Sequence, residues 1–174
     1  MKRRSDPAPH RSWLDRRLAA GLLGAWGSYQ VVAGLYFIFS RPSFLPEDLR
    51  ASATTLEAVR GAAPGIEGWL QLVFAVMGGQ MAAGGVLVMS GAFGLAQGRR
   101  PKRVELCAYI AAGFLSVVLM SGVNFALVSD FRWFLVAPAF LWLSAIIILG
   151  RGALGNASRV ASVLVRPNQG MPHE

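Results

Sequence analysis

The chain contains little cysteine, histidine or charge. Its single cysteine, Cys107, permits no internal disulfide and excludes a thiol–disulfide exchanger built on paired cysteines. The two histidines, His10 and His173, lie in the terminal segments, so neither a buried metal site nor a histidine base can form within the apolar segments. Charged residues make up only 15% of the 174 positions. We therefore predict no cofactor.

Charge is also missing near the middle of four long apolar stretches. A hydrocarbon core of about 30 Å requires roughly 20 apolar residues in a helix that rises about 1.5 Å per residue. Because lipid cannot hydrogen-bond the backbone, each stretch must be helical. The hydrophobic content of 54% and the mean hydropathy of +0.46 agree. We predict an all-α, four-helix transmembrane bundle in residues 18–150, with spans at about 18–39, 69–95, 104–128 and 131–149.

The absence of ionisable groups from these spans narrows the possible functions. Proton-driven carriers usually keep such a group inside the membrane, so proton-coupled transport is disfavoured. Serines within the spans have no neighbouring base that would activate a nucleophile. We therefore expect no enzyme activity. An enzyme acting on lipid or quinone would have to use Glu105, Tyr109 or Asp130 at the interfaces, and the two acidic residues are better explained as partners in interfacial ion pairs.

The Lys and Arg residues lie mostly on one side of the predicted spans. By the positive-inside rule, the basic tail 1–17, the turn 97–103 and the tail 151–174 are cytoplasmic. We expect a multi-pass protein of a bacterial plasma (inner) membrane with both termini in the cytoplasm. The cytoplasmic cations are Lys2, Arg3, Arg4, Arg11, Arg16, Arg17, Arg99, Arg100, Lys102, Arg103, Arg151, Arg159 and Arg166.

The net charge of +8 raises the possibility of a nucleic-acid partner. The cations, however, lie in tails and turns beside apolar helices, and no nucleic-acid-binding motif is present. We predict membrane lipids as partners and no nucleic acid. The residues expected to contact anionic lipid are Arg99, Arg100, Lys102 and Arg103.

The longest connection, from Arg41 to about Gly68, lies between the first two spans. Pro42 and Pro46 end the first helix, and the apolar residues that follow recur at helical spacing. This predicts a short interfacial helix on the outer surface, which either packs on the bundle as a lid or has a gating or partner-binding role. A capping box at Thr54 and Glu57 would split the segment in two.

Small residues recur on the first two spans. Such residues allow membrane helices to approach closely, so we predict that these two helices pack together. The helix-packing positions are Gly24, Gly27 and Gly34 on the first span, and Ala75, Gly78, Ala82 and Gly85 on the second. In the fourth span, Pro138 is expected to bend the helix, because it leaves a carbonyl group without its donor.

Polar side chains inside the spans form a second pattern. Because polar atoms facing lipid are costly, we expect them to look inward and to meet. They would either form interhelical hydrogen bonds or line a small polar cavity for a ligand. The residues of this candidate cluster are Gln30, Gln80, Ser116 and Asn124.

The pattern resembles the small four-helix bacterial membrane proteins grouped as DoxX-like. The resemblance covers most of residues 18–150, and it implies architecture only, with no reaction or catalytic residues. It is carried by Leu35-Tyr36 at the end of the first span, by the outer segment from Pro42 to Pro64, and by Gly78-Gly79 with Gly84-Gly85 in the second span.

Two functions are compatible with these features. The first is a non-enzymatic membrane protein that acts through helix packing, as an accessory or assembly subunit of other membrane proteins or as a homo-oligomer. The alternative is a small transporter or channel for a neutral or lipophilic solute, with Gln30, Gln80 and Asn124 along its pathway.

Overall fold

The computed structural model describes residues 9–164, and the side chains of residues 13–152. Within this part the chain is all-α, as predicted, and contains no strand. The predictions for Lys2, Arg3, Arg4, His10, Arg11, Arg159, Arg166 and His173 lie outside the described side chains. The elements are α1 (Pro9–Phe39), α2 (Pro46–Ala51), α3 (Leu56–Ala62), α4 (Ile66–Ala96), α5 (Arg103–Gly113), the π-helical turn η1 (Phe114–Val118), α6 (Leu119–Ala126) and α7 (Val136–Leu164).

Three helical segments are long and apolar enough to cross a membrane. They are Trp13–Phe39 in α1, Ile66–Ala96 in α4, and Arg103–Ala126, which joins α5, η1 and α6. The second and third predicted spans begin and end within three residues of these segments. The described apolar part of α7, Val136–Gly152, is shorter. α7 itself continues to Leu164, beyond the predicted end of the fourth span at 149.

The fourth helix begins later than predicted, and this changes the position of Pro138 within it. Residues 131–135 form turns, and α7 begins at Val136, which places Pro138 in its first turn. The first four N–H groups of a helix have no intrahelical partner, so a proline there removes no hydrogen bond. The predicted loss of a carbonyl's donor and bend at Pro138 are therefore wrong, because this proline lies at the start of its helix.

The outer connection forms two short helices, α2 and α3, where a single one was predicted. Thr55 Oγ1 accepts a hydrogen bond from the Ala58 N–H at 3.2 Å and caps the start of α3. Ala53 has a positive φ of 48° and turns the chain between the two helices. The segment is therefore split, as the alternative prediction proposed, but Thr55 supplies the cap and Thr54 does not.

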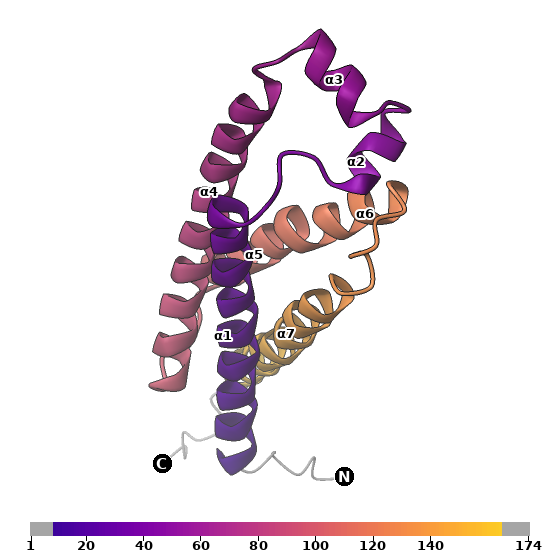
Figure 1. Cartoon of the computed structure of the whole chain (residues 1–174). Helices are drawn as coiled ribbons and strands as arrows, with labels where there is room; N and C mark the ends of the chain where they lie inside the picture. Colours follow the sequence, from indigo (N-terminus) through magenta and orange to yellow (C-terminus); the bar gives the residue numbers. More distant parts are fainter. Residues whose placement is uncertain (1–8, 165–174) are drawn as a thin grey trace, which may run out of the picture.

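α1 is the central helix of the fold and packs mainly on α4 and next on α7 (Figure 1). The predicted packing between the first two spans is confirmed. The two helices are antiparallel, and their backbones approach at two pairs of glycines. A Cβ built on Gly85 would lie 2.5 Å from the Gly27 carbonyl oxygen, and one on Gly34 would lie 2.5 Å from the Gly78 carbonyl oxygen. Only glycine fits at these positions.

The apolar core lies at the end of the molecule where α1 begins and α4 ends. Gly113 allows the Trp142 ring to lie against the backbone of α5, because a Cβ on Gly113 would overlap that ring. The Trp142 indole N–H donates to the Tyr109 carbonyl at 2.9 Å. The core comprises Ala19, Ala20, Leu23, Trp26, Val88, Ala92, Leu95, Val117, Trp142, Ala145 and Leu149.

The third helical segment diverges from α4 toward the opposite end of the molecule, where α2 and α3 lie (Figure 1). The π-helical turn η1 lies in its middle. Sequence periodicity did not predict this turn. At this outer end, contacts from α2 and its flanking residues take the place of the dense helix packing seen at the other end.

The glycine contact generates a first prediction. Gly34→Ala places a methyl group 2.5 Å from the Gly78 carbonyl oxygen and 2.7 Å from the Ala82 amide nitrogen. Both are backbone atoms of α4, so relieving the overlap requires the helix itself to shift. We expect the substitution to lower the free energy of unfolding by about 1–3 kcal/mol. Gly24→Ala on the same helix meets nothing within 4 Å and serves as the control. SDS titration in mixed micelles measures both, and equal effects would contradict the assigned contact.

Candidate functional site

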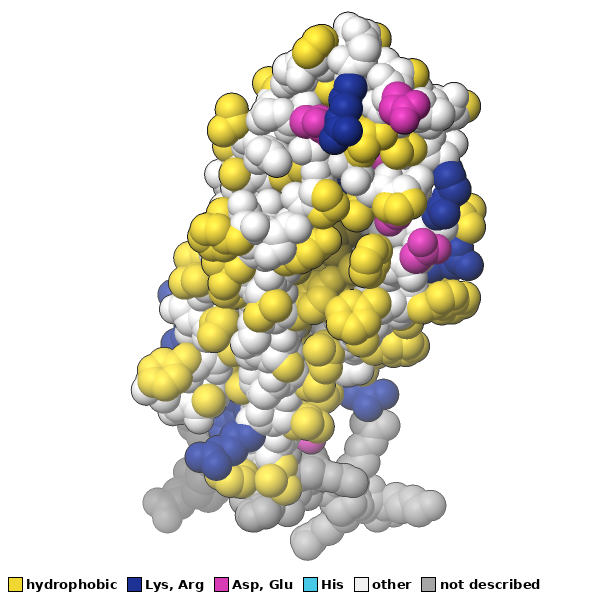
Figure 2. Space-filling view, in the orientation of Figure 1, with side chains coloured by type: hydrophobic (Ala, Val, Ile, Leu, Met, Phe, Trp, Pro, Cys, Tyr) yellow, Lys and Arg dark blue, Asp and Glu magenta, His cyan; other side chains and the backbone are white. Residues whose placement is uncertain are grey.

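The two ends of the described molecule differ in how their charges are arranged. Acidic and basic side chains lie together over the end formed by α2 and α3, whereas the opposite end is mainly basic, and apolar side chains cover the surface between them (Figure 2). At the outer end Arg41 pairs with Asp48 at 3.2 Å, Arg50 with Asp130 at 3.7 Å, and Arg60 with Glu67 at 3.0 Å. The hydrogen bond to Glu67 raises the pKa of the exposed Arg60 guanidinium.

The basic end is built around the connection between α4 and α5. Arg16 Nη1 donates to the Gly98 carbonyl at 3.2 Å, which ties the start of α1 to this connection. Arg99 is hydrogen-bonded to Glu105, so one predicted lipid contact is neutralised within the chain. The other three predicted contacts are exposed and form no ion pair with a described residue; they are Arg100, Lys102 and Arg103.

The outer connection is fastened to several parts of the chain, and its buried polar contacts were not predicted. The Arg41 guanidinium, with a side chain only 10% exposed, lies 3.6 Å from the centroid of the Phe74 ring on α4. Ser43 donates to the Glu67 carbonyl at 2.9 Å. Ser129, in the connection between α6 and α7, donates to Glu47 Oε1 at 2.9 Å.

Glu47 and Ser129 could not be recognised as partners because 82 positions separate them. Glu47 is 4% exposed and Ser129 is 1% exposed. In the sequence, Pro46 followed by Glu47 and Asp48 predicts only the start of a helix. The contact therefore depends on tertiary structure, and it holds the outer end of α6 and α7 beneath α2.

The structure brings together two of the four residues of the predicted polar cluster. Gln30 on α1 is 7% exposed, and its Nε2 donates to Ser116 Oγ in η1 at 3.4 Å. Ser116 in turn donates to the Ala112 carbonyl at 2.6 Å. The amide oxygen of Gln30 faces Gly84, where a Cβ would lie 3.2 Å away. This polar contact joins α1, α4 and η1 inside the bundle.

The other two amides lie apart from this contact. Asn124 Nδ2 donates to the Met120 carbonyl of its own helix at 2.9 Å. Gln80, near the middle of α4, is exposed and has no hydrogen-bond partner among the described residues. The structure therefore places Gln30 and Ser116 together, and it does not bring Gln80 and Asn124 to them.

Gln80 lies on a face of α4 that no described element covers. Residues spaced by three and four along this face share its direction, which is roughly opposite to the glycines that contact α1. Leu72, Val76 and Leu87 on this face are 69%, 66% and 73% exposed. Of the smaller residues, Ala83 is exposed, and Gly79 has open space around its Cα. We call Leu72, Val76, Gly79, Gln80, Ala83 and Leu87 the outward face of α4.

The remaining predicted packing positions are distributed around the same helix pair. Ala82 lies against Gly34, in agreement with its predicted position. Ala75 is half-buried on α4. Gly24, however, meets nothing within 4 Å and opens into a groove on the surface.

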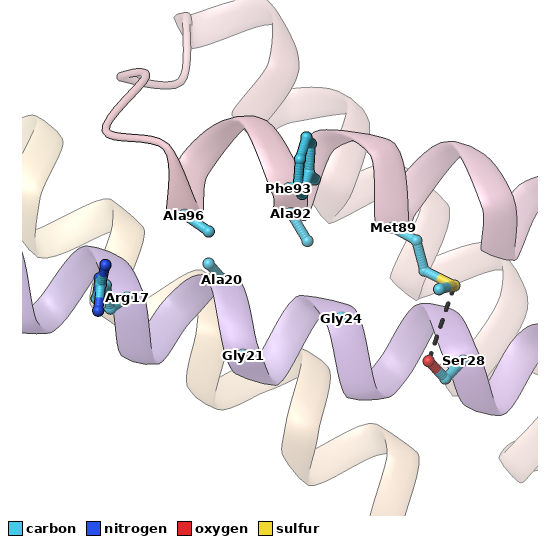
Figure 3. A pocket seen from close by; sticks show the side chains of 9 residues that line it. All are labelled: Arg17, Ala20, Gly21, Gly24, Ser28, Met89, Ala92, Phe93 and Ala96. Atoms are coloured by element: carbon cyan, nitrogen blue, oxygen red, sulfur yellow. Dashed lines mark hydrogen bonds between the residues drawn. The ribbon is translucent and has the colours of Figure 1, made fainter.

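This groove runs between α1 and α4 at the basic end and has a volume of about 520 Å³. Its floor is made by small residues of α1, and Phe93 and Met89 of α4 are among the residues that line it. Ala92 and Met89 point from α4 toward α1 (Figure 3). Arg17 lies toward one end, and at the other Ser28 Oγ lies 3.7 Å from Met89 Sδ (Figure 3). The lining residues are Arg17, Ala20, Gly21, Gly24, Ser28, Met89, Ala92, Phe93 and Ala96.

The acidic side chains considered for interfacial chemistry have partners within the described residues. No three His, Cys, Asp or Glu side chains gather in a metal-binding arrangement there. Of the interfacial candidates, Glu105 bonds to Arg99 and to the Lys102 amide, and Asp130 pairs with Arg50. The arrangement is that of interfacial ion pairs and helix caps.

Comparisons with family models, with curated proteins and with solved structures find no match to this chain. The resemblance to DoxX-like proteins therefore stays a prediction, and the function must be inferred from the contacts described above.

The Gln30 contact generates a second prediction. Ser116→Ala removes the acceptor for Gln30 and the hydroxyl that bonds to the Ala112 carbonyl. We expect the free energy of unfolding to fall by about 1 kcal/mol. Ser121→Ala is the matched control, because the buried Ser121 hydroxyl has no hydrogen-bond partner among the described residues. Its loss should leave the stability unchanged or raise it, because it removes a buried hydroxyl that has no partner among the described residues. A larger loss of stability in Ser121→Ala than in Ser116→Ala would refute the assignment.

The outer contacts generate a third prediction. Glu47→Ala leaves the buried Ser129 hydroxyl without its acceptor and should cost about 1–3 kcal/mol. Asp130→Ala removes an exposed pair with Arg50 and should cost less than about 1 kcal/mol. Hydrogen exchange should show faster opening of the amides at 129–136 in the first variant only. Equal exchange rates in both variants would contradict the role given to Glu47.

Proposed function

We propose that this chain is a non-enzymatic integral membrane protein that acts through helix packing, with the outward face of α4 as its assembly surface. The observation that carries the proposal is Gln80. It is an exposed amide near the middle of a helix long and apolar enough to cross a membrane.

Hydrocarbon offers no hydrogen-bond partner, so a lone amide in that position carries a desolvation cost. A second helix that supplies a partner removes this cost, and such contacts are worth roughly 1 kcal/mol in membranes. Gly79 and Ala83 flank Gln80 and would let the backbone of another helix approach closely. An amide has both donors and acceptors, so Gln80 can pair with Gln80 of a second copy.

The proposal includes four membrane crossings with both chain ends in the cytoplasm of a bacterial cell. The 17-residue stretch Val136–Gly152 is at the lower limit of about 17–25 residues for a spanning helix. The charges support an even number of crossings, because the start of α1 and the basic α4–α5 connection share one end, and Leu149 of α7, two residues before Arg151, lies in the core at that same end. The paired charges around α2 and α3 suit the opposite surface.

A small transporter or channel is less well supported. A solute pathway would need polar groups along one route, whereas Gln30 bonds to Ser116, Asn124 bonds to its own helix, and Gln80 lies on the exposed face. This distribution favours helix packing, either within the chain or between chains. The arrangement of the outer connection also favours a fixed lid over a gate, because its contacts reach α4 and the α6–α7 connection.

A fourth prediction tests the assembly surface. Cys107 is the only cysteine and is exposed, so separate samples can be labelled there with a donor or an acceptor fluorophore. We expect energy transfer above the random level when the two samples share dilute phospholipid vesicles. Gln80→Leu should weaken the association about fivefold, which corresponds to the loss of roughly 1 kcal/mol.

Val76→Leu is the control, since it keeps the outward face apolar. It should change the energy transfer much less than Gln80→Leu. Random energy transfer in the wild-type protein would exclude self-association through this face. If a different membrane protein copurifies and its binding is lost in Gln80→Leu, the face is that of an accessory subunit and the second-copy arrangement is wrong.

A further inference from the structure

The groove between α1 and α4 is about as long as one lipid chain. From Arg17 to Ser28, α1 rises about 16 Å at 1.5 Å per residue. One leaflet contributes half of a hydrocarbon core of about 30 Å, which is about 15 Å. In the proposed membrane position, the groove therefore reaches from the cytoplasmic interface to about the midplane.

The lining of the groove is apolar along this length and cationic at the interface. The groove exists because Ala20, Gly21 and Gly24 have little or no side chain, and the open space at both glycines confirms that no described side chain fills it. Phe93 and Met89 are among its apolar lining residues. Arg17 lies at the end that meets the headgroup region.

The charge at this end lacks a counter-ion in the described part of the chain. No described carboxylate lies within salt-bridge distance of Arg17, whose guanidinium stacks 4.4 Å from the centroid of the Trp13 ring. Arg16 holds the α4–α5 connection beside it through Gly98. That connection continues into Arg100, Lys102 and Arg103, which add positive charge at the same end of the molecule.

We propose that this groove binds one anionic phospholipid of the cytoplasmic leaflet, with an acyl chain along Gly21 and Gly24 and the phosphate against Arg17. Van der Waals packing of the chain in the groove supplies affinity for any phospholipid, because hydrocarbon is already apolar and adds no hydrophobic driving force, and Arg17 supplies the preference for an anionic headgroup. The inference rests on the proposed membrane orientation and does not require self-association. It goes beyond general attraction of basic residues to lipid, because it assigns one site with a defined occupant.

Native mass spectrometry of the full chain in detergent tests the proposal. The protein is titrated with phosphatidylglycerol or with phosphatidylcholine carrying the same acyl chains. We expect one retained phosphatidylglycerol and weaker binding of phosphatidylcholine. Arg17→Gln should lower the affinity for phosphatidylglycerol about fivefold and leave that for phosphatidylcholine nearly unchanged. Gly24→Leu fills the groove and should lower both.

Two controls separate this site from non-specific effects. Arg151→Gln removes an exposed charge from α7, and Gly122→Leu adds the same bulk on α6, where nothing lies within 4 Å. Both should bind lipid as the wild type does. Equal effects of Arg151→Gln and Arg17→Gln, or unchanged binding in Gly24→Leu, would overturn the proposal.

Other outcomes identify which premise failed. If Gly24→Leu abolishes energy transfer between labelled copies without changing the bound lipid, the groove holds a helix of a second copy and the lipid site is wrong. If the protein is recovered in water without detergent, the membrane position itself is wrong. Random energy transfer with normal lipid binding would reject the assembly surface on α4 and leave the lipid site intact.

Discussion

The close approach of two helix backbones is the constraint on which the rest of this fold depends. Gly27 and Gly34 on α1 meet Gly85 and Gly78 on α4, and the spacing of seven residues is the same on both helices. Two such contacts fix the antiparallel register and leave no freedom to slide. With this register set, Gln30 faces Gly84 on one side and Ser116 on the other. The glycine contact therefore sets Gln30 against Gly84, and the third helical segment supplies Ser116 as its hydrogen-bond acceptor.

The two ends of the bundle are stabilised by different interactions. At the basic end, α1, α4 and α7 share an apolar core that includes Trp26 and Trp142. At the outer end, the third helical segment diverges from α4, and the connection that contains Glu47 is fastened by hydrogen bonds and by a guanidinium stacked on an aromatic ring. Apolar packing is non-directional, whereas these polar contacts require defined partners. Substitution of one polar residue at the outer end should therefore disturb only the contacts of that residue, whereas substitution of a core residue should affect the packing of several helices.

Features of this fold that depend only on the local sequence can be predicted from it, whereas features that depend on tertiary contacts cannot. Long apolar runs locate α4 and the third segment to within three residues, because each run has the length that a membrane-crossing helix requires. Pro138 was misplaced because apolar composition does not mark where a helix starts. The π-helical turn η1 gives no periodic signal over five residues. Gln30 and Gln80 look alike as amides in apolar helices, and only the packing of α1 makes one buried and leaves the other exposed.

Small residues have two different effects in the same helix pair: some allow close contact between the helices, and others leave a groove. The direction in which each residue faces decides which effect it has. At about 100° per residue, Gly24 lies about 60° and Gly21 about 120° away from the direction of Gly27 on α1. Gly27 faces α4 so closely that a Cβ there would overlap Gly85 and Met89, whereas Gly21 and Gly24 have nothing within 4 Å and line the groove beside this contact. In a bilayer, a surface groove is filled by lipid if protein does not fill it. Glycine therefore allows close helix contact on one side of α1 and leaves a groove on the adjacent side, where the proposed lipid would complete the packing of α1.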